Sequence, residues 1–245
     1  MKRTEWPNVE LLTFADAGEL VRAAADAWLD AIAAAGRSGQ AYCTALSGGR
    51  VAAKFFAVTA AQAVTRGVAM DPVHFFWADE RCVPPTDPES NFKLAEEILF
   101  RPLKIQPEKI HRIKGENNPK AAAKTAEEEL KRVVGCGQNQ QPGLDLVVLG
   151  MGEDGHVASL FPHAIVNNMD ISDSFLGIED SPKPPPVRVS LSYQAIFAAK
   201  NVWVLVSGAG KLEALRNSLS GKKATPLGQI IAQRKVKIFS DMSEF

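Results

Sequence analysis

The sequence predicts an α/β protein with a mostly parallel β-sheet and helices on both faces. Two observations support this fold class. Apolar runs of strand length alternate with helical stretches along most of the 245 residues, and such alternation is typical of βαβ units. Unusual polar residues also follow directly after several of the predicted strands, at the end of a parallel sheet where ligands bind.

The first half of the chain contains a long helix followed by two strand–helix units. Residues 16–36 (DAGELVRAAADAWLDAIAAAG) have apolar residues at helical spacing and end in glycine, which predicts an amphipathic helix. The apolar run 41–46 (AYCTAL) is a predicted strand before a helix from about 50 to 65. A second strand, 73–78 (VHFFWA), precedes a long loop and a helix that begins near Asn91.

The second half continues the alternation. A helix is expected around 121–134, a strand at 144–150 (LDLVVLG), a strand at 201–206 (NVWVLV), a helix from about 210 to 219, and a final strand at 236–239 (VKIF). The Pro-rich stretch 179–188 (EDSPKPPPVR) is the one segment that resembles a linker. Because the alternation resumes beyond it without a change in composition, we expect a surface loop within a single domain of residues 1–245.

Composition and charge exclude several classes of partner. The chain is 46% hydrophobic and 23% charged, as in ordinary globular proteins. Its 28 basic and 28 acidic residues cancel, so no overall field attracts nucleic acid or an anionic membrane. No apolar run reaches the roughly 18 residues of a spanning helix, and the first residues lack the apolar core of a secretory signal. We therefore expect a cytoplasmic protein with no nucleic-acid or membrane partner.

The scattered cysteines and histidines predict neither a disulfide framework nor a metal site. Cys43, Cys82 and Cys136 form no C-x-x-C pair, which favours a reducing compartment. No set of His, Cys and Asp residues has metal-ligand spacing, and we expect neither a metal nor a cofactor. No long apolar stripe remains outside the predicted core, so a monomer is expected.

Gly150, Gly152 and Gly155 follow an apolar run in the order G-x-G-x-x-G, a spacing shared with dinucleotide-binding loops. Such a loop also needs a long helix after it and an acid at the end of a second strand. Pro162 cuts any such helix short, and Glu153 and Asp154 place negative charge where a pyrophosphate would sit. This loop therefore indicates other chemistry.

Four polar clusters follow four predicted strands, and we expect them to share one cleft. They are SGGR at 47–50, DERC at 79–82, GEDGH at 152–156 and SGAGK at 207–211. The carboxyl ends of parallel strands lie at one edge of the sheet, where ligands bind. This convergence is more informative than any single motif.

Two of these clusters favour an anionic ligand. Gly48 and Gly49 let backbone N–H groups approach an anion where a strand passes into a helix. The SGAGK cluster repeats this design and adds Lys211, whose cation is disfavoured at a helix start unless an anion is bound there. Arg188 is a further candidate. Each cluster alone is also compatible with a tight turn, but together they predict a phosphorylated small molecule.

The GEDGH cluster presents a candidate general base. Neutral imidazole titrates near physiological pH, so His156 is suited to take a proton from water and return it to a leaving group. Asp154, two residues earlier, is placed to fix its tautomer. The alternative is a helix-capping turn with an incidental histidine.

Blocks across nearly the whole chain resemble the 6-phosphogluconolactonases, within the wider glucosamine-6-phosphate isomerase/deaminase family. The blocks occur in the family's order, and they are LSGG, WADERCVPPTDPESNF, LDLVVLGMGEDGHVASLFP, VRVSLS and VSGAGK. The resemblance implies a three-layer α/β/α, Rossmann-like fold and hydrolysis of 6-phosphoglucono-1,5-lactone to 6-phosphogluconate, in the oxidative pentose phosphate pathway and without a cofactor.

The resemblance also implies roles for individual residues. His156 matches the histidine that activates water, with Asp154 beside it, and Asp79 and Arg81 match the group that lines the site. The phosphate and substrate-binding positions are Ser47, Gly48, Gly49, Arg50, Arg188 and Lys211. Arg81 or a loop N–H group is then expected to stabilise the oxyanion.

Two other functions stay open on the residues alone. Family members that act as amino-sugar-phosphate isomerases or deaminases carry a Glu five residues beyond the loop histidine, where this chain has Phe161. A non-catalytic sugar-phosphate sensor would need the binding glycines but not His156, and no DNA-binding segment is visible.

Overall fold

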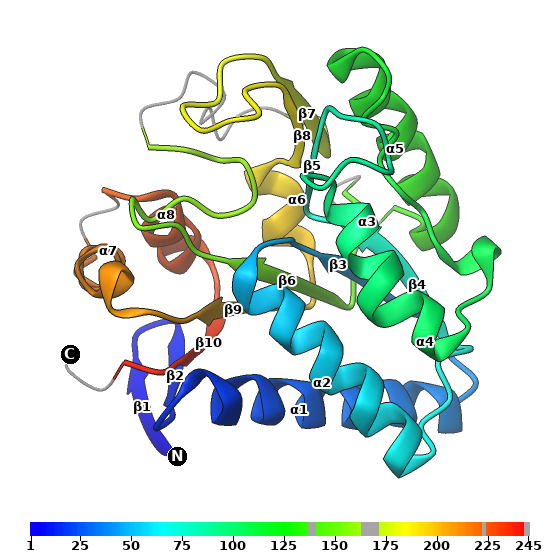
Figure 1. Cartoon of the computed structure of the whole chain (residues 1–245). Coiled ribbons are helices and arrows are strands. Elements are labelled where there is room, and N and C mark those ends of the chain that lie inside the picture. Colours follow the sequence, from blue (N-terminus) through cyan, green and yellow to red (C-terminus); the bar gives the residue numbers. More distant parts are fainter. Residues whose placement is uncertain (137–140, 163–171, 222–223, 243–245) are drawn as a thin grey trace.

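The central sheet has seven strands in the order β1-β2-β10-β9-β6-β3-β4. The computed structural model describes residues 1–136, 141–162, 172–221 and 224–242 (Figure 1). All neighbours from β2 to β4 pair in parallel, and only β1 is antiparallel. The strands are β1 (Lys2–Trp6), β2 (Val9–Thr13), β3 (Tyr42–Leu46), β4 (Val73–Trp77), β6 (Leu146–Gly150), β9 (Asn201–Val206) and β10 (Val236–Ser240).

Helices cover both faces of this sheet, as the alternation predicts. Figure 1 shows α1 and α2 side by side on one face and α6 and α8 on the other. The helices are α1 (Ala17–Arg37), α2 (Arg50–Arg66), α3 (Asn91–Ala95), α4 (Arg101–Leu103), α5 (Pro119–Val134), α6 (Tyr193–Ala198), α7 (Leu212–Leu219) and α8 (Pro226–Gln233). A π-helical turn, η1 (Glu96–Phe100), joins α3 to α4, and 3-10 turns lie at η2 (Pro107–Lys109) and η4 (Ala209–Lys211).

A second, three-stranded antiparallel sheet lies beside the first. Its order is β5-β8-β7, from β5 (Asp79–Arg81), β8 (Arg188–Leu191) and β7 (Phe175–Ile178). None of these strands is predicted from the sequence, because they are only three or four residues long and β5 is fully charged. The Pro-rich stretch 179–188 contains the connection from β7 to β8, two paired strands of this same sheet.

The predicted fold class is confirmed, and most predicted elements lie within one or two residues of the observed ones. The hairpin of β1 and β2 is absent from the sequence prediction. β1 (KRTEW) has little apolar character, and its turn passes through Asn8, whose φ is 62°. The helix expected near Asn91 begins there but continues through the π-helical turn.

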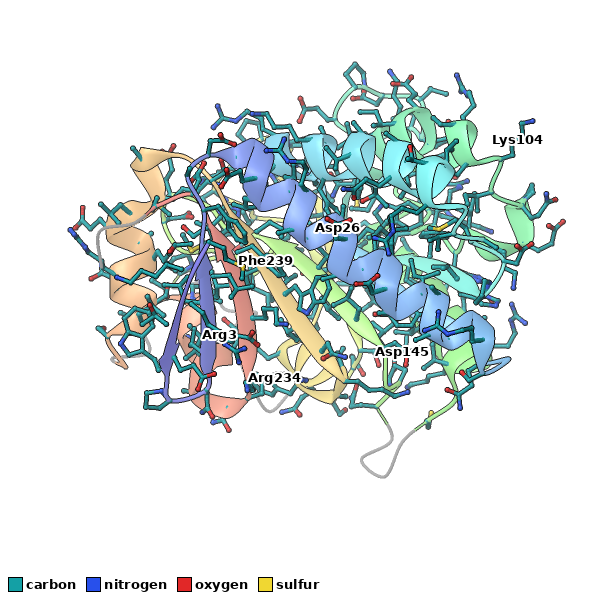
Figure 2. The ribbon with its side chains drawn as sticks, turned by 90° about the horizontal axis from the view of Figure 1, so that it is seen from below. Arg3, Asp26, Lys104, Asp145, Arg234 and Phe239 are labelled. Carbon is teal, nitrogen blue, oxygen red and sulfur yellow. The ribbon has the colours of Figure 1, made fainter. Side chains whose placement is uncertain are left out.

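Packing between α1, α2 and the sheet fixes the direction of α2. Trp28 of α1 is fully buried, stacks on Phe55 of α2 with ring centroids 5.3 Å apart, and meets the edge of Phe75 in β4. At the surface, Arg66 of α2 pairs with Asp26, which Figure 2 shows on the outer side of α1. α2 begins four residues after the carboxyl end of β3, so its first turn lies at this edge of the sheet. Within the described residues, no helix is long and apolar enough to cross a membrane.

Candidate active site

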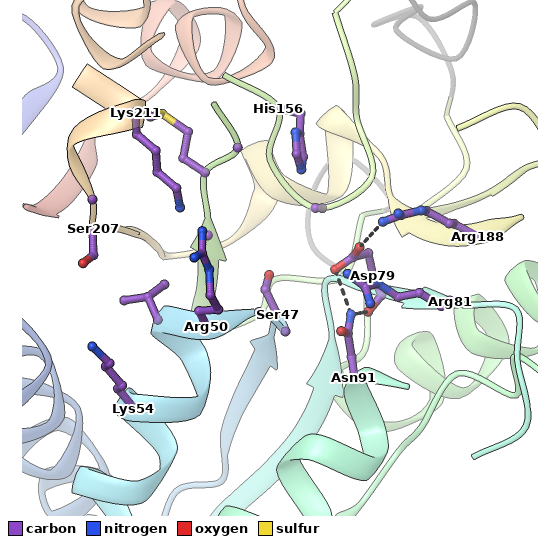
Figure 3. A pocket seen from close by; sticks show the side chains of 18 residues that line it. Ser47, Arg50, Lys54, Asp79, Arg81, Asn91, His156, Arg188, Ser207 and Lys211 are labelled. Carbon is purple, nitrogen blue, oxygen red and sulfur yellow. Dashed lines mark hydrogen bonds and ion pairs between the residues drawn. The ribbon is translucent and has the colours of Figure 1, made fainter. Parts of the chain in front are cut away.

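A cavity of about 350 Å³ opens at the carboxyl ends of the parallel strands. All four polar clusters of the sequence contribute to its walls, so the predicted convergence is observed. In Figure 3, Arg50, Lys54, Ser207 and Lys211 lie on one side and Asp79, Arg81, Asn91 and Arg188 on the other, with His156 between the two groups. The wall also contains Ser47, Gly48, Gly49, Val51, Gly150, Met151, Gly152, Ala158 and Gly208.

The first side of the cavity is formed by the N-terminus of α2. Gly49 is the N-cap residue, with a φ of 95°, and no side chain caps the free N–H groups of the first turn. The Ser47 hydroxyl is buried and has no hydrogen-bond partner among the described residues. Free N–H groups at a helix N-terminus and an unpaired hydroxyl are together suited to bind an anion.

Three cations surround this helix end. Arg50 and Lys54 lie one turn apart on α2, and Lys211 enters from the turn after β9. That turn is held by Asp241, whose carboxylate accepts hydrogen bonds from the Ser207 hydroxyl and the Gly208 N–H. Burial lowers the pKa of Lys211, and the nearby Arg50 lowers it further. A bound anion would reverse this mutual repulsion, so this side is electrostatically prepared for phosphate.

The opposite side is organised around the buried carboxylate of Asp79. Ser159 Oγ donates to Asp79 Oδ2 at 2.7 Å, and Asn91 Nδ2 donates to the Asp79 carbonyl at 2.9 Å. Asn91 is placed by Glu80, which accepts hydrogen bonds from the backbone N–H groups of Asn91 and Phe92 at the start of α3. The cavity wall is therefore fixed from β5, α3 and the loop after β6 at once.

Gly48 is required by the approach of Asn91. A Cβ atom at Gly48 would lie only 1.8 Å from Asn91 Oδ1, so any side chain there would displace Asn91 or the turn before α2. The glycine thus brings the two sides of the cavity into contact.

Most of the N–H groups of Arg188 donate hydrogen bonds within the protein. Its Nε donates to the Pro185 carbonyl, and Nη2 donates to the carbonyls of Lys183 and Pro184. Nη1 donates to Ser159 Oγ at 3.4 Å and lies 4.0 Å from Asp79 Oδ2. Four of the five N–H groups of a guanidinium therefore have acceptors among the described residues, which leaves one for a ligand.

His156 is presented to the cavity by a tight turn. Gly152 N–H donates to the His156 carbonyl at 2.9 Å, and a Cβ atom at Gly152 would lie 2.1 Å from the imidazole. On the side away from the cavity, His156 Nδ1 lies 2.5 Å from Asp154 Oδ1. Because an ionised carboxylate only accepts, this contact places the proton on Nδ1 and leaves the lone pair on Nε2.

The charge state of this pair suits a base. Burial lowers the pKa of His156 and outweighs the opposing effect of Asp154. For Asp154, burial acts to raise the pKa, but the hydrogen bond and charge of His156 prevail and lower it. The imidazole is therefore neutral and the carboxylate ionised near neutral pH.

Phe161 contacts both His156 and Arg188. Its ring is fully buried, with its centroid 4.4 Å from that of His156, and the Arg188 guanidinium lies 5.6 Å from it. An aromatic ring in this place restricts the tilt of the imidazole without offering it a hydrogen-bond acceptor.

The cavity is lined by every residue predicted for the site from the sequence except Asp154. Asp154 contacts His156 Nδ1 outside the cavity wall. Two polar residues were missed. Lys54 could have been found from its i+4 spacing to Arg50, which places both on one helix face. Asn91 carried no comparable signal, because its position depends on Glu80. Within the described parts of the chain, no group of three or more His, Cys, Asp or Glu side chains could hold a metal ion.

Comparison with known proteins places the chain in a family. The family model described as glucosamine-6-phosphate isomerases/6-phosphogluconolactonase matches residues 15–239. A 6-phosphogluconolactonase of Haemophilus influenzae is 39% identical over 171 residues, 70% of each chain. A 6-phosphogluconolactonase of Mycobacterium tuberculosis is 35% identical over 213 residues, 85% of each chain.

Solved structures agree on the fold. A 6-phosphogluconolactonase from Leishmania guyanensis superposes with a TM-score of 0.81 at 25% identity, covering 94% of this chain and 95% of the other. A monomeric glucosamine-6-phosphate deaminase reaches 0.79 at 17% identity, covering 94% and 96%, so this fold is shared by both chemistries. With a family model over nearly its whole length, the chain belongs to the family of glucosamine-6-phosphate isomerases and 6-phosphogluconolactonases.

Proposed function

We propose that the protein hydrolyses 6-phospho-D-glucono-1,5-lactone to 6-phospho-D-gluconate. The observation that carries this proposal is a neutral, oriented imidazole between an anion-binding helix end and a second polar wall, in one cavity. The relatives with 35% and 39% identity have this activity in their names.

The phosphate is assigned to the cavity side with the α2 N-terminus. There it would accept hydrogen bonds from the backbone at Gly48 to Arg50 and from Ser47, and Lys211 and Arg50 would balance its charge. Arg188 has one N–H group left, which does not suit a forked contact to phosphate. Its place beside Asp79 favours a contact to the lactone ring instead.

The reaction then needs one base and one water. His156 Nε2 takes a proton from water, and the oxygen of that water adds to the C1 carbonyl. The tetrahedral oxyanion is stabilised by Arg81 or a loop N–H group. When the bond between C1 and the ring oxygen breaks, the imidazolium donates its proton to that oxygen. Asp154 keeps the imidazole in the required tautomer and stabilises its charged form.

Phe161 argues against the rival deaminase chemistry. Amine loss requires ring opening and a proton transfer between two sugar carbons, for which related enzymes support the loop histidine with a Glu at this position. Here the ring packs on His156 and supplies no carboxylate. A sugar-phosphate sensor is disfavoured by the Asp154–His156 pair, which binding alone does not need.

We also propose that the chain acts as a monomer in the cytosol. Cys43, Cys82 and Cys136 are free thiols, which suits a reducing compartment. Met1 and Val64 are the exposed large apolar side chains among the described residues, too few for the apolar centre of an obligate interface. Light scattering coupled to gel filtration should give a mass near 26.5 kDa. A stable dimer mass at micromolar concentration would contradict the proposal.

Replacing the base should reduce turnover. His156→Ala should lower kcat by roughly 10²–10⁴-fold, the usual contribution of a positioned acid–base group, with a smaller change in KM. In the unmodified protein, kcat/KM should fall only at a pH below the usual titration range of histidine, because burial lowers the pKa of His156. A thermal melt checks that the variant is folded. Near-normal turnover in the folded variant would remove His156 from the mechanism.

Removing the cation proposed to bind the phosphate group should weaken substrate binding. Lys211→Ala should raise KM by roughly 10- to 100-fold, the scale of a charge-assisted hydrogen bond, because phosphate is bound alike in ground and transition states. Discrimination against unphosphorylated glucono-1,5-lactone should fall in parallel. Lys124→Ala, at an exposed position on α5, is the matched control. A drop in kcat alone would assign Lys211 a different role.

Two substrates separate the candidate functions. The purified protein is offered freshly generated 6-phosphogluconolactone, corrected for spontaneous hydrolysis, and glucosamine 6-phosphate with ammonia release followed. Both satisfy the phosphate subsite, so only the chemistry beyond it differs. We expect fast lactone hydrolysis and no detectable ammonia. Ammonia release at a comparable rate would establish the deaminase, and inactivity on both substrates would favour the sensor.

A further inference from the structure

The loop between β7 and β8 is held rigidly beside the active site. Ser181 N–H donates to the Pro186 carbonyl at 3.0 Å, and Ser181 Oγ donates to the Lys183 carbonyl at 3.1 Å. Arg188 donates to the carbonyls of Lys183, Pro184 and Pro185. The backbone of Lys183 is therefore fixed by two donors at once, one of them a buried guanidinium of the cavity wall.

These hydrogen bonds place the Lys183 side chain next to Asp154, the carboxylate that contacts His156. Lys183 Nζ lies 3.5 Å from Asp154 Oδ2, whereas Asp154 Oδ1 faces His156 Nδ1 at 2.5 Å. One carboxylate is thus shared between an ammonium group and an imidazole, each on its own oxygen. Lys183 does not line the cavity, and 45% of its side chain is exposed.

We propose that Lys183 is a positioning residue of the active site, which holds Asp154 and sets the charge balance around the His156 imidazole. The inference deepens the proposed function, because it rests on His156 acting as a base. Lys183 would act through Asp154 rather than by touching the substrate.

The charges that face His156 have opposing effects. Among the described residues, Asp154 and Asp79 stabilise the imidazolium, whereas Lys183 destabilises it. The Arg188 guanidinium packs on the Phe161 ring, which also contacts His156. Burial is the largest cause of the lowered pKa of His156, and Lys183 adds to it. Without this ammonium, burial would be the remaining effect against the Asp154 carboxylate, and the imidazole would take up a proton at a higher pH.

The test is an NMR titration of His156 in the ligand-free protein. Lys183→Met should raise the pKa of His156 by roughly 0.2 to 0.7 pH unit, the range that a partly exposed ion pair supports. Lys183→Arg should leave it unchanged, and Asp154→Asn should move it in the opposite direction. The matched control is Lys200→Met, which removes an exposed ammonium paired with Asp145 at 2.6 Å. Asp145 precedes β6, at the opposite end of that strand from the cavity (Figure 2).

Kinetics provide the second measurement. In Lys183→Met, the acid limb of the kcat/KM profile should shift to higher pH together with the titration, with KM unchanged on the alkaline side. An unchanged pKa in Lys183→Met, an equal shift in Lys183→Arg, or a raised KM without a pKa shift would each overturn the proposal. The titration needs no substrate, so a protein inactive on the lactone would refute the proposed function while the role of Lys183 in the charge balance is still decided.

Discussion

Six neighbouring strands of the central sheet, from β2 to β4, run in the same direction. Each loop that follows β3, β6 or β9 must therefore begin at the same edge. The consequence is that residues from distant parts of the chain, such as Ser47, His156 and Lys211, line one cavity. The second sheet adds Asp79 and Arg188 from the side, because β5 follows β4 after a single residue and pairs with β8.

Charge is distributed unevenly within this cavity. On the side with the α2 N-terminus, the cations have no carboxylate in direct contact within the described residues. The opposite side contains the Asp79 carboxylate, which is contacted by Ser159, Asn91 and Arg188. A ligand with one dianionic end and one neutral, polar end matches this distribution. His156 lies between the two regions, where a carbonyl at the neutral end of such a ligand would meet it (Figure 3).

Features of the fold that depend on local sequence pattern and on strand direction could be predicted from the sequence. The parallel sheet, the strand at 201–206 and the convergence of four polar clusters all follow from periodicity and from the geometry of βαβ units. The rest depends on packing that no local pattern shows. Asn91 reaches the cavity only because Glu80 binds the start of α3, and the short strands β5, β7 and β8 are stabilised by one another. Arg188 is predicted from the sequence as a phosphate or substrate-binding residue, but its hydrogen bonds to the carbonyls of residues 183–185 belong to a loop whose course could not be derived from its prolines.

The contacts of Phe161 with both His156 and Arg188 have a consequence for how the two chemistries of this family differ. A carboxylate introduced at this position would lie next to a buried guanidinium with one N–H group still available, and it would pair with that cation rather than with the imidazole. A single substitution is then insufficient to convert one activity into the other, because Arg188 would have to change as well, and with it the anchoring of residues 183–185. Phe161 thus links the surroundings of the imidazole to the anchoring of that loop, in a fold that both chemistries share.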